Sequence, residues 1–298
     1  MMRDHQHTGF TQRFLNGFNI RRNKRRFSDK IFYDVDVNDA RAITKVWITT
    51  LVKRINETAT DPVSETIVFS NLDAITRALR TGKVDLLILL PMEHLEISKQ
   101  TPLQPILTGI VREAFSYEYA LLVHCETGAK SLGQLRGRKL VVDTGGKGRI
   151  PQMWLDTVLL ENGLPESEGL FKQVKDVSKT SQAVLPVFFG KADACLVPLQ
   201  TFRTMVELNP QLGEALTPLA KSPGFCRGLV CARQDIYDRY KGFIQEALHM
   251  LNLDPQGQQL LTIFRVDELI SFEPSHLAGV RKLAQEYELL KAGSGSKP

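Results

Sequence analysis

A glycine-rich loop at residues 144–149 carries the residue types best suited to binding an anion. It reads Thr-Gly-Gly-Lys-Gly-Arg, and a helix is predicted to begin just beyond it, at Pro151. Glycines let the backbone approach a ligand closely, and backbone N–H groups at a helix N-terminus attract negative charge. The loop is therefore either an anion site or a plain connection between strand and helix. The candidate ligand contacts in it are Thr144, Gly145, Gly146, Lys147 and Gly148.

A second predicted helix start, at residues 178–181, offers hydroxyl groups. The sequence there is Ser-Lys-Thr-Ser. A Ser or Thr at such a position can cap the helix, because its side chain accepts a hydrogen bond from a backbone N–H of the first turn.

The sequence lacks the patterns that mark the common catalytic and metal sites. Glu93-His94 has no second histidine at the spacing of a zinc protease, and residues 144–148 lack the Gly-Lys-Ser/Thr ending of a nucleotide-binding loop. His124 and Cys125 are neighbours in a predicted strand, so their side chains would point to opposite faces. We therefore predict no catalytic residue, no metal and no cofactor.

The four cysteines also lack metal-ligand spacing and are expected to be small buried side chains. Cys226 and Cys231 fall in one extended segment, where their side chains would point to opposite faces. We therefore expect no disulfide between them.

A turn of the form Gly-Lys-x-Asp, between a predicted helix and a predicted strand, occurs twice in the sequence. Gly-Lys-Val-Asp-Leu at residues 82–86 and Gly-Lys-Ala-Asp-Ala at residues 190–194 each end a predicted helix and begin an apolar strand. Glycine is the usual residue just past a helix C-terminus. The repetition favours two lobes of similar build. Asp85 and Asp193 lie at strand starts, away from the strand ends where open α/β sheets bind ligands, so we assign them structural roles.

The elements of the first lobe follow from hydrophobic periodicity and capping residues. An amphipathic helix is predicted over residues 38–55 and a short strand over 66–69. A second helix capped by Ser70 or Asn71 should run to Leu79 and be followed by a strand over 84–90. A strand, helix and strand in this order indicate a parallel sheet that is covered on both faces.

The second lobe repeats this order with a strand over 140–142, a helix over 151–160, a helix from Ser178 to Gly190 and a strand over 194–197. A long extended segment over 108–123 and another over 225–232 would cross between the lobes. Helices over 237–251 and 276–290 would then rejoin the first lobe.

Length and composition indicate an ordinary globular protein, and the charge gives no argument for a nucleic-acid surface. The 298 residues are 43% apolar and 24% charged, which fits two globular domains. Residues 1–30 hold eight Lys or Arg against two Asp, so the net charge of +5 lies in this segment and the remainder is about neutral. We expect a basic, disordered tail over 1–26 and no nucleic-acid partner.

The chain resembles the type II periplasmic binding proteins, most closely those that import phosphate, phosphite and phosphonate. The resemblance covers residues 27–290. The segments that carry it are Phe32-Tyr33-Asp34, Ser70 to Leu90, Ser131 to Lys139, Asp143 to Pro151 and Gly190 to Val197.

The resemblance implies an α/β fold of two lobes, each a mixed, mostly parallel sheet flanked by helices and joined by two crossing strands. Lobe 1 would comprise residues 27–115 and 225–298, and lobe 2 residues 116–224. It also implies a monomeric binding protein that closes on a small oxyanion and passes it to an ABC transporter permease. A ligand sensor and a cofactor-biosynthesis enzyme on the same fold are the alternatives.

Further expectations come from the same resemblance. Tyr33 would offer an aromatic ring to the ligand, and Thr180 or Ser181 would take the position of a polar ligand contact. In the family, the 144–148 region is rich in Ser and Thr, whereas here only Thr144 keeps a hydroxyl, so carboxylates and sulfonates would satisfy the same donors. The implied location is periplasmic or extracytoplasmic, although the sequence shows no recognisable signal peptide.

Overall fold

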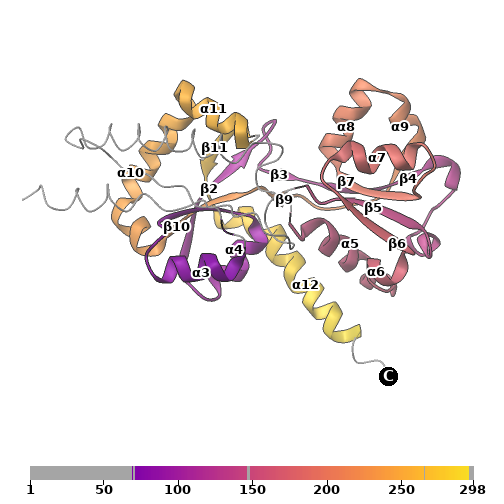
Figure 1. Ribbon diagram of the computed structural model, residues 1–298, viewed down its shortest axis with the longest axis horizontal. Helices are drawn as coiled ribbons and strands as arrows, with labels where there is room; N and C mark the ends of the chain where they lie inside the picture. Colours follow the sequence, from indigo (N-terminus) through magenta and orange to yellow (C-terminus); the bar gives the residue numbers. More distant parts are fainter. Residues whose placement is uncertain (1–68, 70, 146–147, 265, 295–298) are drawn as a thin grey trace, which may run out of the picture. The chain divides into compact units, whose positions relative to one another are not determined.

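The computed structural model describes residue 69 and residues 71–145, 148–264 and 266–294 (Figure 1). These residues divide into two units. Unit 1 contains the described residues up to Phe115 together with Arg227–Glu273, and unit 2 contains Ser116–Cys226 together with the residues from Pro274 onward. The predictions for Tyr33, Gly146 and Lys147, for the tail over 1–26 and for the helix over 38–55 lie outside the described residues.

Unit 1 is built on a four-stranded sheet in the order β1-β10-β2-β11. All three described ladders in this sheet are antiparallel, which differs from the expected mostly parallel sheet. Except for residue 69, the strand predicted over 66–69 lies outside the described residues. The reason is topological, because the chain re-enters the unit as β10 and runs against both of its neighbours. The elements are α3 (Leu72–Arg80), β1 (Leu86–Leu89), α4 (Pro91–Ser98), β2 (Leu103–Ile110), β10 (Leu229–Arg233), α10 (Gln234–Leu253), α11 (Pro255–Phe264) and β11 (Glu268–Ser271).

Local chemistry sets both ends of α3, as the sequence predicts. The side chain of Asn71 accepts a hydrogen bond from the Ala74 N–H at 2.8 Å. At the other end Gly82 adopts a left-handed φ of 63°. The N–H groups of Gly82 and Lys83 donate to the carbonyls of Leu79 and Ala78 at 3.1 and 2.9 Å. These bonds satisfy helix carbonyls that would otherwise lack partners.

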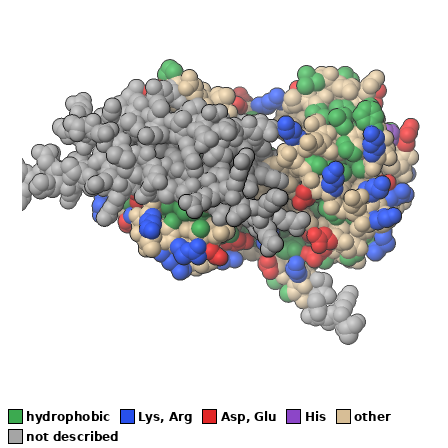
Figure 2. All heavy atoms as spheres, in the orientation of Figure 1, with side chains coloured by type: hydrophobic (Ala, Val, Ile, Leu, Met, Phe, Trp, Pro, Cys, Tyr) green, Lys and Arg blue, Asp and Glu red, His purple; other side chains and the backbone are tan. Residues whose placement is uncertain are grey.

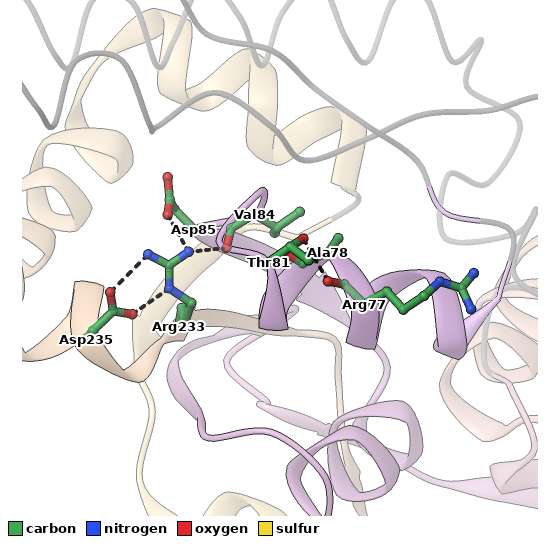
Figure 3. A network of polar contacts seen from close by, with 7 residues as sticks. All are labelled: Arg77, Ala78, Thr81, Val84, Asp85, Arg233 and Asp235. Atoms are coloured by element: carbon green, nitrogen blue, oxygen red, sulfur yellow. Dashed lines mark hydrogen bonds and ion pairs between the residues drawn. The ribbon is translucent and has the colours of Figure 1, made fainter.

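Asp85, which follows this turn, is held by Arg233 at the end of β10 (Figure 3). Its carboxylate lies 3.1 Å from the Arg233 guanidinium, and the two side chains are 3% and 13% exposed. Arg233 also donates to the Val84 carbonyl at 3.2 Å and pairs with Asp235 on α10. Bonding to Asp235 raises the pKa of Arg233, and the same contact lowers the pKa of Asp235. The structural role predicted for Asp85 is confirmed.

Unit 2 contains a mixed five-stranded sheet in the order β6-β5-β7-β4-β8. Its β5 is parallel to β6 and β7, whereas β4 is antiparallel to β7 and β8. Helices α7 and α8 contribute to a buried apolar cluster against this sheet. The strands are β4 (Tyr119–His124), β5 (Lys139–Asp143), β6 (Gln173–Val177), β7 (Ala194–Pro198) and β8 (Leu216–Lys221). The helices are α5 (Ile150–Glu161), α6 (Ser167–Leu170), α7 (Thr180–Phe188), α8 (Leu199–Leu208), α9 (Gln211–Ala215) and α12 (Ala278–Ser294).

Asp193, the counterpart of Asp85, ties the start of β7 to the start of β5. Its carboxylate accepts the Lys139 N–H at 2.8 Å, and its own N–H donates to the Lys139 carbonyl at 3.0 Å. Arg138 lies 3.5 Å from the same carboxylate, but that arginine side chain is 59% exposed. The structural role predicted for Asp193 is also confirmed, with a more exposed ion pair than in unit 1.

The connections between the units differ from the predicted pair of long crossing strands. The extended segment expected over 108–123 is interrupted after β2 by a turn in which Arg112 and Glu113 have left-handed φ values of 49° and 63°. Beyond the turn, β3 (Ser116–Tyr117) and β9 (Phe225–Cys226) are two-residue strands that pair with each other inside unit 2.

The C-terminal helix α12 packs on α5 of unit 2, whereas the sequence analysis placed residues 225–298 in lobe 1. A buried tyrosine on α12 bonds to another part of unit 2. The Tyr287 hydroxyl donates to the Glu166 carboxylate at 2.5 Å, and Lys291 lies 3.3 Å from the same oxygen. The hydrogen bond from Tyr287 lowers the pKa of Glu166.

A buried acid on α5 gives a testable consequence for stability. The Asp156 carboxylate accepts the Ser167 N–H at 2.7 Å, and burial raises the pKa of Asp156 despite this bond. A carboxyl whose pKa is raised by folding favours the fold at low pH and loses that advantage as the pH rises. An asparagine at this position would keep the acceptor oxygen without the charge. We therefore expect Asp156→Asn to melt at the same temperature as the parent or higher at about pH 7.

Thermal melts followed by circular dichroism at about pH 7 and pH 4 check this expectation. The advantage of Asp156→Asn should shrink at the lower pH, where the parent carboxyl becomes protonated. Asp176→Asn, which alters an exposed aspartate on β6, is the matched control and should change little. A large loss of stability in Asp156→Asn at neutral pH would contradict the account.

Within the described residues, no helix is long and apolar enough to cross a membrane. Figure 2 shows Lys and Arg side chains interspersed with Asp and Glu side chains over the visible face of unit 2.

Candidate functional site

Three neighbouring strands of unit 2 end at the same edge of the sheet. Strands β6, β5 and β7 are parallel, with Asp143 paired to Val177 at the ends of β5 and β6. From this edge the chain leads into α5, α7 and α8. Ligands of open α/β sheets bind outside the carboxyl ends of parallel strands. The described residues of the loop at 144–149 and the segment at 178–181 therefore lie at the edge where a ligand is expected.

Asp143, the last residue of β5, bonds to residues on both sides of this edge. Its carboxylate accepts a hydrogen bond from the Thr180 hydroxyl at 2.7 Å through one oxygen. Through the other it accepts the Gly145 N–H at 3.0 Å. Asp143 is 1% exposed and Thr180 is 8% exposed. One buried carboxylate thus joins the loop after β5 to the first turn of α7.

Gly145 is required by close packing against the neighbouring loop. A Cβ atom built on Gly145 would lie 2.2 Å from the Ser178 carbonyl oxygen and 3.0 Å from the Asp143 carboxylate. The adjacent Thr144 N–H donates to the Val177 carbonyl at 3.0 Å. The two loops are therefore in direct backbone contact, and the glycine permits that contact.

The remaining described part of the loop leads into α5. Gly148 is exposed and has a left-handed φ of 60°, a conformation that favours glycine. Arg149 is exposed at the helix N-cap position, Ile150 begins the helix, and Pro151 lies in its first turn as predicted. The N-terminal end of α5 therefore follows directly from the candidate loop.

The two hydroxyl residues of α7 have different environments. The N-cap residue is Lys179, and the Thr180 hydroxyl bonds to Asp143. The capping alternative is therefore wrong for Thr180. Ser181 is half-buried in the first turn. A ligand at this edge would meet the positive end of the α7 dipole.

The sequence analysis did not identify Asp143 as a site residue. An acidic residue at the last position of an apolar strand, directly before a glycine-rich loop, is the available signal. The partners of Asp143 lie 2 and 37 residues away. The sequence does not reveal that Thr180 reaches this carboxylate, because the contact depends on the parallel alignment of β5 and β6.

The two histidines singled out in the sequence, His94 and His124, lie beside neighbouring protein groups. His94 is buried in unit 1, with the Ser98 hydroxyl 3.2 Å from its ring and the Cys231 sulfur 3.8 Å away. His124 Nδ1 accepts the Glu126 N–H at 3.3 Å. The described residues contain no group of three or more side chains suited to hold a metal ion.

None of the four cysteines, all of which lie in the described part of the chain, forms a disulfide. Cys195, Cys226 and Cys231 are buried as expected, whereas Cys125 is exposed and the expectation of burial is wrong for it. Burial raises the pKa of Cys226 to about 12 and also raises the pKa of Cys195. Such thiols are poor nucleophiles because the reactive form is the thiolate.

Solved structures show the class of fold. The chain matches the protein XAC2383 from Xanthomonas citri, solved bound to ATP, with a TM-score of 0.65 at 13% identity, covering 86% of this chain and 94% of that one. It matches a binding protein component of an ABC phosphonate transporter from Pseudomonas aeruginosa with a TM-score of 0.58 at 14% identity, covering 88% and 86%. The match to PhnD1 from Prochlorococcus marinus, solved with methylphosphonate, has a TM-score of 0.55 at 16% identity and covers 85% of this chain and 95% of that one. The fold is that of type II periplasmic binding proteins.

The family follows from the sequence. Residues 44–277 match the family model described as "ABC transporter, phosphonate, periplasmic substrate-binding protein". The chain belongs to this family of periplasmic phosphonate-binding proteins, whose members are binding components of ABC transporters and not enzymes. No curated protein matches the chain.

Proposed function

We propose that the chain binds a small oxyanion of the phosphate or phosphonate class, closes on it and presents it to an ABC transporter permease. The observation that carries the proposal is the edge of unit 2 where β5, β6 and β7 end. There the loop after β5 and the start of α7 are joined through Asp143. Two helix N-termini, those of α5 and α7, follow from this edge, and their dipoles favour negative charge.

The candidate contacts take different roles in this proposal. Thr144 and Gly145 shape the loop through their contacts with the segment at 177–178. Ser181 and the backbone of Gly148 would contact the oxyanion. Gly146, Lys147 and Tyr33 are proposed contacts on the strength of the sequence and the family resemblance. Thr180 would contact the ligand while it remains bonded to Asp143.

Membership of the phosphonate-binding family supports a phosphonate ligand. Methylphosphonate, which occupies PhnD1 from Prochlorococcus marinus, is therefore the first probe. Phosphate, phosphite, methanesulfonate and acetate complete a panel of small anions.

A thermal-shift panel tests the proposal, because a ligand that binds only the folded state raises the melting temperature according to its occupancy. We expect methylphosphonate, phosphite or phosphate to raise the melting temperature of the parent. Ser181→Asp should abolish the shift, because it places a negative charge at the proposed contact. An aspartate in the first turn is compatible with the helix dipole, so this variant should still fold.

The matched control is Ser131→Asp, which adds the same charge at the start of a short helix elsewhere in unit 2, Leu132–Leu135. This variant should respond to ligand like the parent. The proposal is wrong if no anion in the panel shifts the melting temperature, or if Ser181→Asp responds as strongly as Ser131→Asp.

A further inference from the structure

We propose that one face of helix α7 in unit 2 is a docking surface for an anionic lipid bilayer. This surface, here called the α7 face, combines two apolar side chains exposed on the helix with three exposed lysines on neighbouring segments: Leu185, Phe189, Lys139, Lys175 and Lys191. The chain belongs to a family of binding components of ABC transporters, which work beside a membrane. The proposal does not depend on which ligand the site binds.

The apolar part of the α7 face lies at the end of the helix. Leu185 is 39% exposed, and Phe189, the C-cap residue, is 64% exposed. The two side chains are four residues apart and therefore lie on the same side of the helix. The Phe189 ring stands edge-on to Phe188, with the ring centroids 5.0 Å apart, and Phe188 packs on the buried apolar cluster of unit 2. Phe189 is therefore an aromatic group that the core holds in place at the surface.

Two lysines lie on the same side of the sheet as α7, because side chains alternate along a strand. Val141 on β5 belongs to the buried cluster that contains the α7 side chains, and Lys139 lies two residues before it. Lys175 on β6 is the direct partner of Val141 in the parallel register. It also lies two residues before Val177, which packs on the same cluster. Both lysines are exposed, so their charges flank the helix on the side of β6.

The turn after α7 adds the third lysine. Gly190 leaves the helix with a left-handed φ of 68°, and the exposed Lys191 follows it. The helix itself contains no acidic residue. Asp193, the next acid along the chain, accepts the Lys139 N–H at 2.8 Å and lies 3.5 Å from Arg138. The α7 face therefore presents positive charge around an apolar centre.

This combination fits a bilayer that contains anionic lipids. Apolar side chains enter the boundary between head groups and acyl chains, and lysines beside them attract the negative surface. Long lysine stems can lie along apolar groups while the ammonium groups stay among the lipid phosphates. Contact with the bilayer would hold the protein close to a transporter embedded in it.

Cosedimentation of the intact chain with lipid vesicles, in a low-salt buffer without phosphate, tests the proposal. We expect binding to vesicles of equal parts phosphatidylcholine and phosphatidylglycerol, and release at about 0.5 M sodium chloride, where salt screens the charges. Lys175→Glu/Lys191→Glu should bind at least about tenfold more weakly, because each lysine near an anionic surface contributes about fivefold. Phe189→Ser changes no charge and should weaken binding at least about fivefold.

Arg281→Glu/Lys282→Glu is the matched control, because it makes the same change in net charge at exposed residues of α12. Helix α12 packs on α5. The α5 crossover runs from β5 to β6 and the α7 crossover runs back from β6 to β7, so right-handed connections place α5 and α7 on opposite faces of the sheet. The control should bind vesicles like the parent.

Circular dichroism establishes which variants are folded, and Phe189→Ser decides the outcome if the double lysine variant does not fold. Failure of the parent to bind the anionic vesicles at low salt overturns the proposal. Equal binding by the α7-face variants and the control also overturns it, and assigns the binding to other cations such as those of residues 1–30. Neither result bears on the oxyanion function, which the anion panel tests without lipid.

Discussion

Gly145→Ala is expected to destabilise the protein by about 1–3 kcal/mol, the usual cost of forcing an extra carbon into a packed interior. The new Cβ atom would lie 2.2 Å from the Ser178 carbonyl oxygen. The position of a Cβ atom is fixed by its own backbone, and the carbonyl oxygen is a backbone atom. Turning a side chain therefore cannot relieve the contact. The loop after β5 would have to move away from the start of α7. Urea denaturation measures the loss, and calorimetry with methylphosphonate should show weakened binding.

Gly133→Ala is the matched control for this substitution. A Cβ atom at Gly133 would meet only a leucine methyl group at 3.8 Å, an ordinary contact. This variant should be nearly as stable as the parent and should bind as the parent does. If Gly145→Ala behaves like Gly133→Ala in both measurements, the close packing of the two loops does not determine the shape of the site.

Arg233→Met is expected to produce the largest loss of stability, about 3–5 kcal/mol, because it leaves the Asp85 carboxylate buried without its cation. Asp85 is 3% exposed and Arg233 is 13% exposed. The same arginine also bonds to the Val84 carbonyl and to Asp235 (Figure 3). Urea denaturation followed by circular dichroism gives the free energy of unfolding.

The ion pair at the corresponding turn of unit 2 supplies the comparison. Arg138 is 59% exposed and lies 3.5 Å from Asp193, and exposed pairs contribute about 0–1 kcal/mol. Arg138→Met should therefore cost little. Replacing both Asp85 and Arg233 by apolar residues should recover part of the loss, since no charge is then left buried. Equal effects of Arg233→Met and Arg138→Met would contradict the assignment of Asp85 and Arg233 as the buried anchor of unit 1.

The helix ends and strand starts could be predicted because their causes are local. Asn71 begins α3 through a bond to a backbone N–H three residues away, and Gly82 and Gly190 follow helices with left-handed φ values of 63° and 68°. Pro151 lies in the first turn of α5. Each signal acts within a few residues, so the sequence contains the whole interaction.

Strand directions and the position of the last helix could not be predicted, because distant residues decide them. β10 lies between β1 and β2 and is antiparallel to both, which no local pattern specifies. The attachment of α12 to unit 2 includes a hydrogen bond from Tyr287 to Glu166, 121 residues away in sequence, beside its packing on α5. Hydrophobic periodicity identified that helix without indicating its partner.

The candidate site divides in the same way. The glycine-rich loop was predicted from its residue types and the hydroxyl residues at the start of α7 from the family resemblance, and the structure brings Thr144, Gly145 and Thr180 together. The sequence analysis expected glycines here to let the backbone approach a ligand. In the structure, Gly145 is needed because its backbone lies against the Ser178 carbonyl. Asp143 was missed because its role depends on the side chain of Thr180, which lies on α7, the helix that follows the neighbouring strand β6.

Hydrogen–deuterium exchange of the intact chain, with and without methylphosphonate, tests the central claim most directly. It reports which backbone N–H groups a ligand protects. The account predicts protection of peptides that cover residues 144–149 and 178–182, and loss of that protection in Ser181→Asp. Binding that protects other segments of unit 2 and leaves these two unchanged would contradict it.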